Sequence, residues 1–463
     1  MIPAGEFNAN LSVKREEYGI VFGLNYELGC RRNKDQLLTA SYNYSSAPTR
    51  QQDLNDVTQI LGPVPANLLQ SNKTGAKEQT FQLDYVYPVK SVNIEGGAKL
   101  IHRNNDAAYT SGYFDPTSGK FAQDSSSSNT FNYLQDIYGF YNSYLIKTGK
   151  WGISGGIRLE RTVIHADFET SDTSLGQQYN NLIPSLSVQR NINGISNLTI
   201  GYTQRIQRPS IWQLNPFVNK SDPAFYVAGN PDLKAVVNHN LSAGYSWFKK
   251  GFLHIELDYS FATNTIQRVT TVKADSISLA SYQNVGSNKL VSAALNVNYP
   301  ISKALSFSLN GLVSYIWIEG MVDDQSYKNK GLQGNAYCYF MWRLKNNWRA
   351  AVNGGFFSPT VLLQGSSSGF FYSSLRVIRS LLNNKLTISA SVTNPYQQYR
   401  VLNNKLETRE LIQDYSYDKV SRTFSIGLNY NFGKLREQLK KNKHGIQNDD
   451  ISTKKNNTEK GGQ

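Results

Sequence analysis

The sequence has no hydrophobic run long enough to form a transmembrane helix. Such a helix needs about 18 or more consecutive apolar residues, and only 40% of the 463 residues are hydrophobic. A helical membrane protein is therefore excluded. A membrane β-barrel is still allowed, because a spanning strand needs only about 9–11 residues and turns every second side chain towards a polar lumen.

Cysteine and methionine are also scarce. Two cysteines are too few for a disulfide framework. Cys30 falls in a predicted turn and Cys338 within a predicted strand, so no disulfide is expected. The chain has 3 methionines against 29 tyrosines and 21 phenylalanines. Tyrosine and tryptophan favour the interface between membrane and water, where the ring is half buried and its polar atom stays hydrated.

A secretion signal is missing from the first residues. The stretch MIPAGEFNANLSVKREE lacks the basic segment followed by an apolar segment that marks a signal peptide. Two interpretations stay open, a cytosolic chain or a part of a longer exported protein. The net charge of +14 is interpreted as a solvated basic surface. Nucleic-acid binding is not expected, because no basic helix or compact cluster of Lys and Arg precedes the tail.

Signatures of enzymes and metal sites are missing as well. The five histidines are scattered without the spacing of metal ligands; they are His102, His165, His239, His254 and His444. There is no G-x-S-x-G elbow, phosphate-binding loop or dinucleotide fingerprint. The sequence therefore predicts a protein that is not an enzyme and uses neither a cofactor nor a metal.

The dominant signal that is present is a period-two alternation of apolar and polar residues. In 422–434 one face carries Phe424, Ile426, Leu428, Tyr430 and Phe432, and the other carries Ser425, Gly427, Asn429 and Asn431. The same alternation occurs at 20–28, 38–44, 241–247, 291–299, 305–317 and 386–392. Alternation over such lengths predicts β-strands, and helical periodicity is nearly absent.

The strand pattern favours a membrane barrel over a soluble sandwich or propeller. By pattern the strands run for about 10–13 residues, whereas sandwich strands usually run for about 5–6. Their polar face is built mainly from Ser, Thr, Asn and Gly with few charges. A hydrated lumen explains that composition, whereas a soluble surface usually carries more Lys and Glu. The apolar faces are therefore predicted to contact lipid.

Short and long connections alternate along the chain. The short ones are 147–150, 191–194, 249–251, 302–303, 345–347 and 383–385, and the long ones are 46–77, 104–129, 165–178, 208–235, 320–330 and 395–415. Tight turns at one end and long loops at the other are typical of outer-membrane barrels. The prediction is an all-β, transmembrane antiparallel up-and-down β-barrel with about 18 strands over residues 1–433. The charged segment 434–463 is predicted to be a disordered periplasmic tail.

One long loop carries a more specific pattern. Residues 202–234 read YTQRIQRPSIWQLNPFVNKSDPAFYVAGNPDLK. This resembles the barrel of TonB-dependent receptors, in particular the outer-membrane β-barrel family with R-P-S, L-N-P-F, D-P and G-N-P-x-L-K in that order. The matching residues are Arg208, Pro209, Ser210, Leu214, Asn215, Pro216, Phe217, Asp222, Pro223, Gly229, Asn230, Pro231, Leu233 and Lys234. The stretch GIRLERT also looks like the family's G-x-R-x-E strand, which places Arg158 and Glu160 on the lumen face.

The resemblance implies an outer-membrane protein with lipid around it. It also implies an N-terminal plug domain, the TonB complex acting through that plug, and a surface lipoprotein as a further partner. Such barrels have 22 strands, so about four strands and the plug are expected to be absent here, with the barrel incomplete at its N-terminal side. Ala235 stands where the family usually has proline.

Two groups of candidate residues follow. The aromatic side chains Trp212, Phe217, Phe225 and Tyr226 are predicted to contact ligand in an extracellular vestibule. The alternative is that the prolines of this loop serve only to rigidify it. Arg158 and Glu160, two residues apart on one strand face, are predicted to form a polar ladder towards the plug.

The leading functional interpretation is a receptor that takes up a nutrient ligand in a TonB-dependent manner. The first alternative is an unplugged, porin-like diffusion channel. The second is an outer-membrane adhesin or enzyme whose function lies in its long loops.

Overall fold

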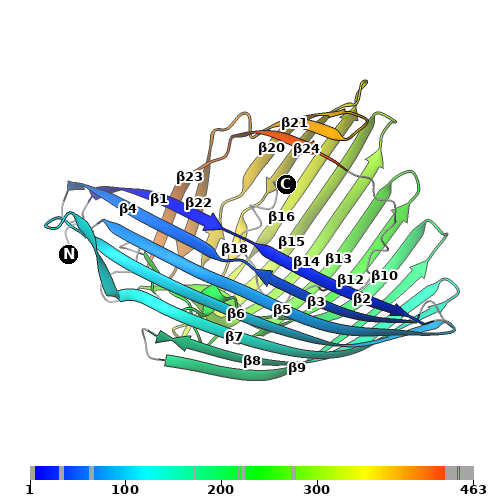
Figure 1. The fold of residues 1–463 in the computed structure, drawn as a ribbon, viewed down its shortest axis with the longest axis horizontal. Helices are drawn as coiled ribbons and strands as arrows, with labels where there is room; N and C mark the ends of the chain where they lie inside the picture. The colour runs from blue at the N-terminus through cyan, green and yellow to red at the C-terminus, as the bar shows by residue number, and fades with distance from the viewer. Residues whose placement is uncertain are drawn as a thin grey trace.

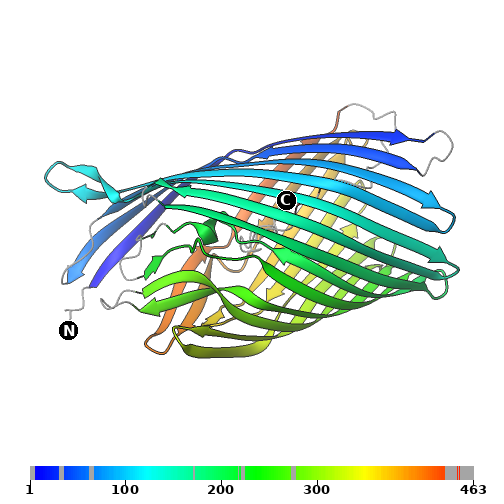
Figure 2. The ribbon, with the colours of Figure 1, turned by 90° about the horizontal axis from the view of Figure 1, so that it is seen from below.

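The computed structural model describes residues 6–30, 36–61, 67–169, 173–216, 218–219, 225–272, 278–432, 446 and 448. These residues form one 20-stranded sheet and one smaller sheet of four strands. The large sheet is a curved wall of long, tilted strands that wraps around a central space (Figures 1 and 2). The all-β, antiparallel architecture predicted from the alternation is confirmed. No helix among the described residues is long and apolar enough to cross a membrane.

The wall strands follow one another in chain order, and neighbours in the sequence are mostly neighbours in the sheet. The first half consists of β1 (Glu6–Glu17), β2 (Ile20–Gly29), β3 (Leu37–Ser46), β4 (Thr49–Leu61), β5 (Leu68–Val89), β6 (Val92–Asp115), β7 (Lys120–Thr148), β8 (Trp151–Phe168), β9 (Thr173–Asn191) and β10 (Ser196–Gln207). A loop with the helix α1 (Ile211–Leu214) and the strand β11 (Phe225–Val227) follows. The second half consists of β12 (Val236–Phe248), β13 (Phe252–Val272), β14 (Ser278–Pro300), β15 (Leu305–Val322), β16 (Gln325–Arg343), β17 (Trp348–Phe357), β20 (Phe370–Leu381), β21 (Leu386–Thr393) and β24 (Thr423–Tyr430).

Two strands of the wall are interrupted by a local break. The first is divided into β1 and β2, and the second into β3 and β4. The ladder between β1 and β4 ends where Glu17 pairs with Thr49, and the ladder between β2 and β3 begins where Ile20 pairs with Ser46. With each pair counted once and the three-residue β11 set aside, the twenty strands of the large sheet reduce to seventeen, close to the eighteen predicted. The first strand, β1, pairs with β4 along its whole length. Within the described residues, β2 pairs only with β3, and β24 pairs only with β21.

The outer face of the wall shows where the bilayer lies. On β14 the outward residues from Val291 to Tyr299 are apolar or aromatic, and they pair in register with the equally apolar outward face of β15. Aromatic rings border this band at both levels. The ring centres of Phe307 and Phe340 lie 5.0 Å apart at the end with the short turns. Those of Tyr315 and Trp317 lie 4.5 Å apart at the other end. An apolar band between two aromatic girdles is the pattern of a transmembrane β-barrel.

Several of the long connections expected from sequence are strand extensions. Residues 104–129 form most of a hairpin in which β6 and β7 stay paired up to Asp115 and Lys120. Similarly, β15 and β16 stay paired up to Val322 and Gln325. The alternation fades there because both faces lie beyond the apolar band, although the backbone ladder continues. The four short strands β18 (Thr360–Leu362), β19 (Gly365–Ser367), β22 (Tyr399–Glu407) and β23 (Ile412–Val420) form the smaller sheet at the same end.

Candidate functional site

The inner face of β8 changes character along its length. Near the middle of the strand it carries Glu160 and Thr162, and further on it carries Ile164, Ala166 and Phe168, all of them buried. The outward face becomes more polar in the same direction, because Leu159 is exposed within the apolar band and the later outward positions include Arg161, His165 and Asp167. Apolar residues on the inside of this end require a covering element, and the loop between β10 and β12 supplies it.

This loop folds inward and begins with a short helix. Figure 2 shows α1, drawn in green, on the inner side of the curved wall of strands. The backbone N–H of Ser210 donates to Gln213 Oε1 over 2.9 Å, which fixes the start of the helix, and the N–H of Asn215 donates to the carbonyl of Ile211 over 3.0 Å at its end. The motif residues Ser210 and Asn215 therefore serve the local fold of the loop.

Arg208 attaches the start of the loop to the wall. Its side chain is 1% exposed, and its Nη2 donates to Glu160 Oε2 over 2.5 Å and to Thr162 Oγ1 over 2.9 Å. Arg158 Nε lies 2.6 Å from the other carboxylate oxygen of Glu160. One buried carboxylate therefore holds two guanidinium groups, one from the loop and one from its own strand. Removing one partner of a buried ion pair strongly destabilises the folded protein, because the remaining charge stays buried without compensation.

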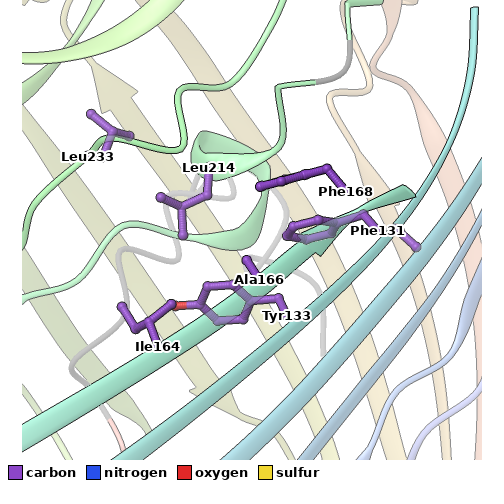
Figure 3. Packing of buried hydrophobic residues seen from close by; sticks show 8 residues of the cluster. Phe131, Tyr133, Ile164, Ala166, Phe168, Leu214 and Leu233 are labelled. Atoms are coloured by element: carbon purple, nitrogen blue, oxygen red, sulfur yellow. The ribbon is translucent and has the colours of Figure 1, made fainter. Parts of the chain in front are cut away.

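Apolar packing attaches the rest of the loop. Leu214 and Leu233 are 2% and 1% exposed, and they pack with the buried inner side chains of β6, β7 and β8 (Figure 3). The wall contributes Ala107, Phe131, Tyr133, Ile164, Ala166 and Phe168. Ile266 of β13 and Tyr282 of β14 pack against the same cluster. The loop therefore links wall strands on both sides of β10 and β12.

The returning half of the loop is held by its backbone and by Asn230. The N–H groups of Gly229 and Asn230 donate to the carbonyls of Asn215 and Gln213 over 2.7 and 2.6 Å. The side chain of Asn230 donates to the carbonyl of Tyr282 over 2.9 Å. The strand β11 pairs in parallel with the start of β14. These contacts close the loop on itself and on the wall.

Gly229 is required by this close approach. A Cβ at this position would collide with the backbone of Asn215 and Gln213. We expect Gly229→Ala to weaken both backbone hydrogen bonds and to destabilise the loop by about 1–3 kcal/mol, the usual cost of overpacking. Amide hydrogen exchange of residues 228–230 measures the effect. Gly176→Ala on β9 is the control, because its Cβ meets nothing within 4 Å. Equal exchange in both variants would contradict the assignment.

A second inward segment covers the inner face of β13 and β15. Gln364, between β18 and β19, accepts from the N–H of Thr270 over 2.7 Å and donates to its carbonyl over 3.3 Å. Leu363 packs with Val269, Ile316, Ile318 and Val322 in a separate buried cluster. The end of the barrel away from the short turns is thus narrowed by two anchored segments.

A polar network lines the lumen on β5, β6 and β7. Arg103, 2% exposed, donates to Glu78 Oε2 over 2.6 Å and to Gln135 Oε1 over 2.9 Å. Asn448 also reaches this network, and its amide donates to Glu78 Oε1 and to Thr80 Oγ1 over 2.7 and 2.8 Å. Of the predicted tail 434–463, only Ile446 and Asn448 lie among the described residues.

The predicted site residues take several different places in the fold. Arg158, Glu160 and Arg208 come together as one buried cluster, and Asn215, Gly229 and Asn230 hold the loop. Trp212 is 55% exposed, Tyr226 is half buried, and Phe225 lies under the guanidinium of Arg268, with Cζ 5.5 Å from the ring centre. Phe217, Asp222 and Pro223 lie outside the described residues. Pro209 follows the anchoring arginine, Pro216 follows Asn215, and the carbonyl of Pro231 accepts from Gln177 over 3.4 Å.

Sequence reasoning did not identify the network around Arg103. Glu78 and Gln135 are 25 and 32 residues away from Arg103 in the sequence, and no local pattern joins them. The available signal was the set of charged residues on otherwise neutral lumen faces.

The wall, its apolar band and its girdles define an outer-membrane β-barrel. The chain matches the Outer membrane protein beta-barrel family over residues 31–430. It belongs to this family, and its location is the outer membrane. Comparison with curated protein sequences gives no significant match.

Solved structures of transporters and receptors share the fold. The copper transporter OprC is similar with a TM-score of 0.61 at 14% identity, and the match covers 92% of this chain and 66% of that one. The siderophore receptor PiuA from Acinetobacter baumannii has a TM-score of 0.57 at 9% identity, covering 90% and 74%. The ferric yersiniabactin uptake receptor FyuA from Yersinia pestis has a TM-score of 0.54 at 12% identity, covering 93% and 68%. This chain therefore spans less than two thirds of the OprC chain.

The family and the two kinds of strand connection predict which side of the membrane each end of the barrel faces. Short turns of outer-membrane barrels face the periplasm and long connections face outside. We expect a protease site inserted between Thr117 and Ser118, at the tip of the β6–β7 hairpin, to be cleaved on intact cells. A site between Thr148 and Gly149 should be cleaved only after the outer membrane is opened. The reverse pattern would invert this topology.

Proposed function

We propose that this chain is the barrel of a TonB-dependent receptor that imports a nutrient ligand. The fold shared with the three uptake proteins supports this assignment. So does the polar inner wall, which offers hydrogen-bonding groups to a plug domain. The partners proposed are that plug, the TonB complex acting through it, and a surface lipoprotein.

The observation that carries the proposal is the anchored loop in the barrel mouth. Arg208, Leu214 and Leu233 fix its base in buried contacts, while Trp212 on the same loop stays 55% exposed. An exposed aromatic ring on a fixed support loses little conformational entropy when it binds a ligand. We therefore assign Trp212, Phe225 and Tyr226 to ligand contact. Phe217, which lies outside the described residues, is assigned to the same role from the sequence.

Whole-cell uptake tests this function. The protein is expressed from its complete gene in cells with and without TonB, and labelled ferric siderophores, copper, oligopeptides and oligosaccharides are supplied in turn. We expect at least one ligand class to accumulate only in the cells that have TonB. Accumulation of small solutes that does not depend on TonB would instead support a diffusion channel. Binding of a ligand at the surface without accumulation would support an adhesin.

A further inference from the structure

Three lysines gather on the outward face of the wall just beyond the apolar band. Lys289 on β14, Trp317 on β15 and Lys330 on β16 form one row of the ladder. Glu319 and Lys328 occupy opposite register positions on β15 and β16, in the next row away from the membrane. All of these side chains are exposed. None of the three ammonium groups has an ion-pair partner in the part of the chain that the structure describes.

These lysines border a groove of about 560 Å³ on the outside of the barrel. Tyr259, Val291 and Trp317 form its apolar floor, at the level of the aromatic girdle. Lys289, Lys328 and Lys330 line the side away from the membrane centre. The groove is therefore apolar towards the acyl chains and cationic towards the headgroups. On the wall near β6 and β7, by contrast, outward His102 is paired with Asp136 over 2.7 Å.

We propose that this groove binds a phosphorylated glycolipid of the outer leaflet, of the lipid A class. Its phosphate groups would accept hydrogen bonds from the three lysines, and its acyl chain would pack on Trp317 and Val291. A lysine near an anionic lipid surface contributes a favourable electrostatic interaction, and the aromatic ring suits the boundary between chain and headgroup. Glu319 limits the positive charge and favours a ligand whose phosphates approach from the Lys289 and Lys330 sides.

Equilibrium binding of lipid A to the folded, detergent-solubilised full chain tests the proposal. Native mass spectrometry compares lipid A with two phosphates against the same lipid after dephosphorylation. The key variant replaces Lys289, Lys328 and Lys330 by glutamine. We expect its dissociation constant for lipid A to rise roughly a hundredfold, because each lysine contributes about a fivefold factor. The dephosphorylated lipid should bind parent and variant equally weakly.

The matched control replaces Lys249, Lys303 and Lys345 by glutamine. These lysines are exposed at the short turns, so the loss of charge is the same but the site is different. Heat-dependent mobility in SDS gels checks that all three proteins are folded. Equal loss of affinity in both triple variants would overturn the proposal, as would binding that ignores the phosphates. Displacement of lipid A by an equal concentration of inorganic phosphate would also overturn it, because a free anion uses no apolar floor.

Discussion

Replacing Arg208 by methionine is expected to release the loop 208–235 from the barrel wall. The substitution removes the guanidinium that donates to Glu160 over 2.5 Å and to Thr162 over 2.9 Å, at a site that is 1% exposed. Losing one partner of a buried ion pair costs about 3–5 kcal/mol. The lower end applies here because Arg158 continues to neutralise Glu160. About 3 kcal/mol corresponds to a change in the opening equilibrium of roughly a hundredfold.

Hydrogen exchange measures this release locally. The amides of Asn215, Gly229 and Asn230, whose partners are carbonyls within the loop, should exchange roughly a hundredfold faster in the variant. The amides of β14 should be unaffected between Leu290 and Val297. Arg161→Met is the control. Arg161 is the outward-facing neighbour of Glu160 on β8, and it donates a hydrogen bond to Gln178 at an exposed site. Unchanged exchange at Gly229 in Arg208→Met would refute the role of this anchor.

Leu295→Arg is expected to oppose insertion into a bilayer. Leu295 is central in the outward apolar band of β14, between Ala293 and Val297. An arginine on the lipid face near the midplane costs about 2–4 kcal/mol. Leu309→Arg on β15 should have a similar effect. Folding into lipid vesicles, followed by urea titration, gives the free energy of unfolding for each variant.

The neighbouring Asn296→Arg variant is the control. Asn296 lies on the opposite face of the same strand and is exposed towards the lumen. Arginine there stays hydrated, so the free energy of unfolding should change by less than about 1 kcal/mol. Equal destabilisation by Leu295→Arg and Asn296→Arg would mean that the two faces are not separated into lipid and lumen.

The fold was predictable where one physical contrast dominates the sequence. Within the bilayer, lipid on one side and water on the other impose the alternation seen at 291–299, and that alternation predicted β14 and its outward face. Beyond the bilayer the contrast disappears, so the sequence predicts a loop where β6 and β7 stay paired as far as Asp115 and Lys120. The backbone ladder there does not depend on which side chains it carries.

The site was predictable only in its parts. Arg158 and Glu160 were placed on the lumen face by their spacing, and Arg208 was marked by the resemblance to the receptor family. That Arg208 binds Glu160 could not be predicted, because the two are 48 residues apart and meet only through the fold of the loop. For the same reason Ile164, Ala166 and Phe168 could not be assigned to an inner face, since their burial depends on Leu214 and Leu233.

The central claim is that the anchored loop in the barrel mouth holds the ligand. Its most direct test is the affinity of intact cells for the ligand found by the uptake experiment, measured with Trp212→Ala and Tyr226→Ala. Truncation of an aromatic residue at a binding hot spot costs about 2 kcal/mol or more, so the dissociation constant should rise roughly thirtyfold in at least one variant. Phe140→Ala on the exposed outer face of β7 should leave it unchanged. Unchanged affinity in both loop variants, with the protein folded and present at the surface, would contradict the claim.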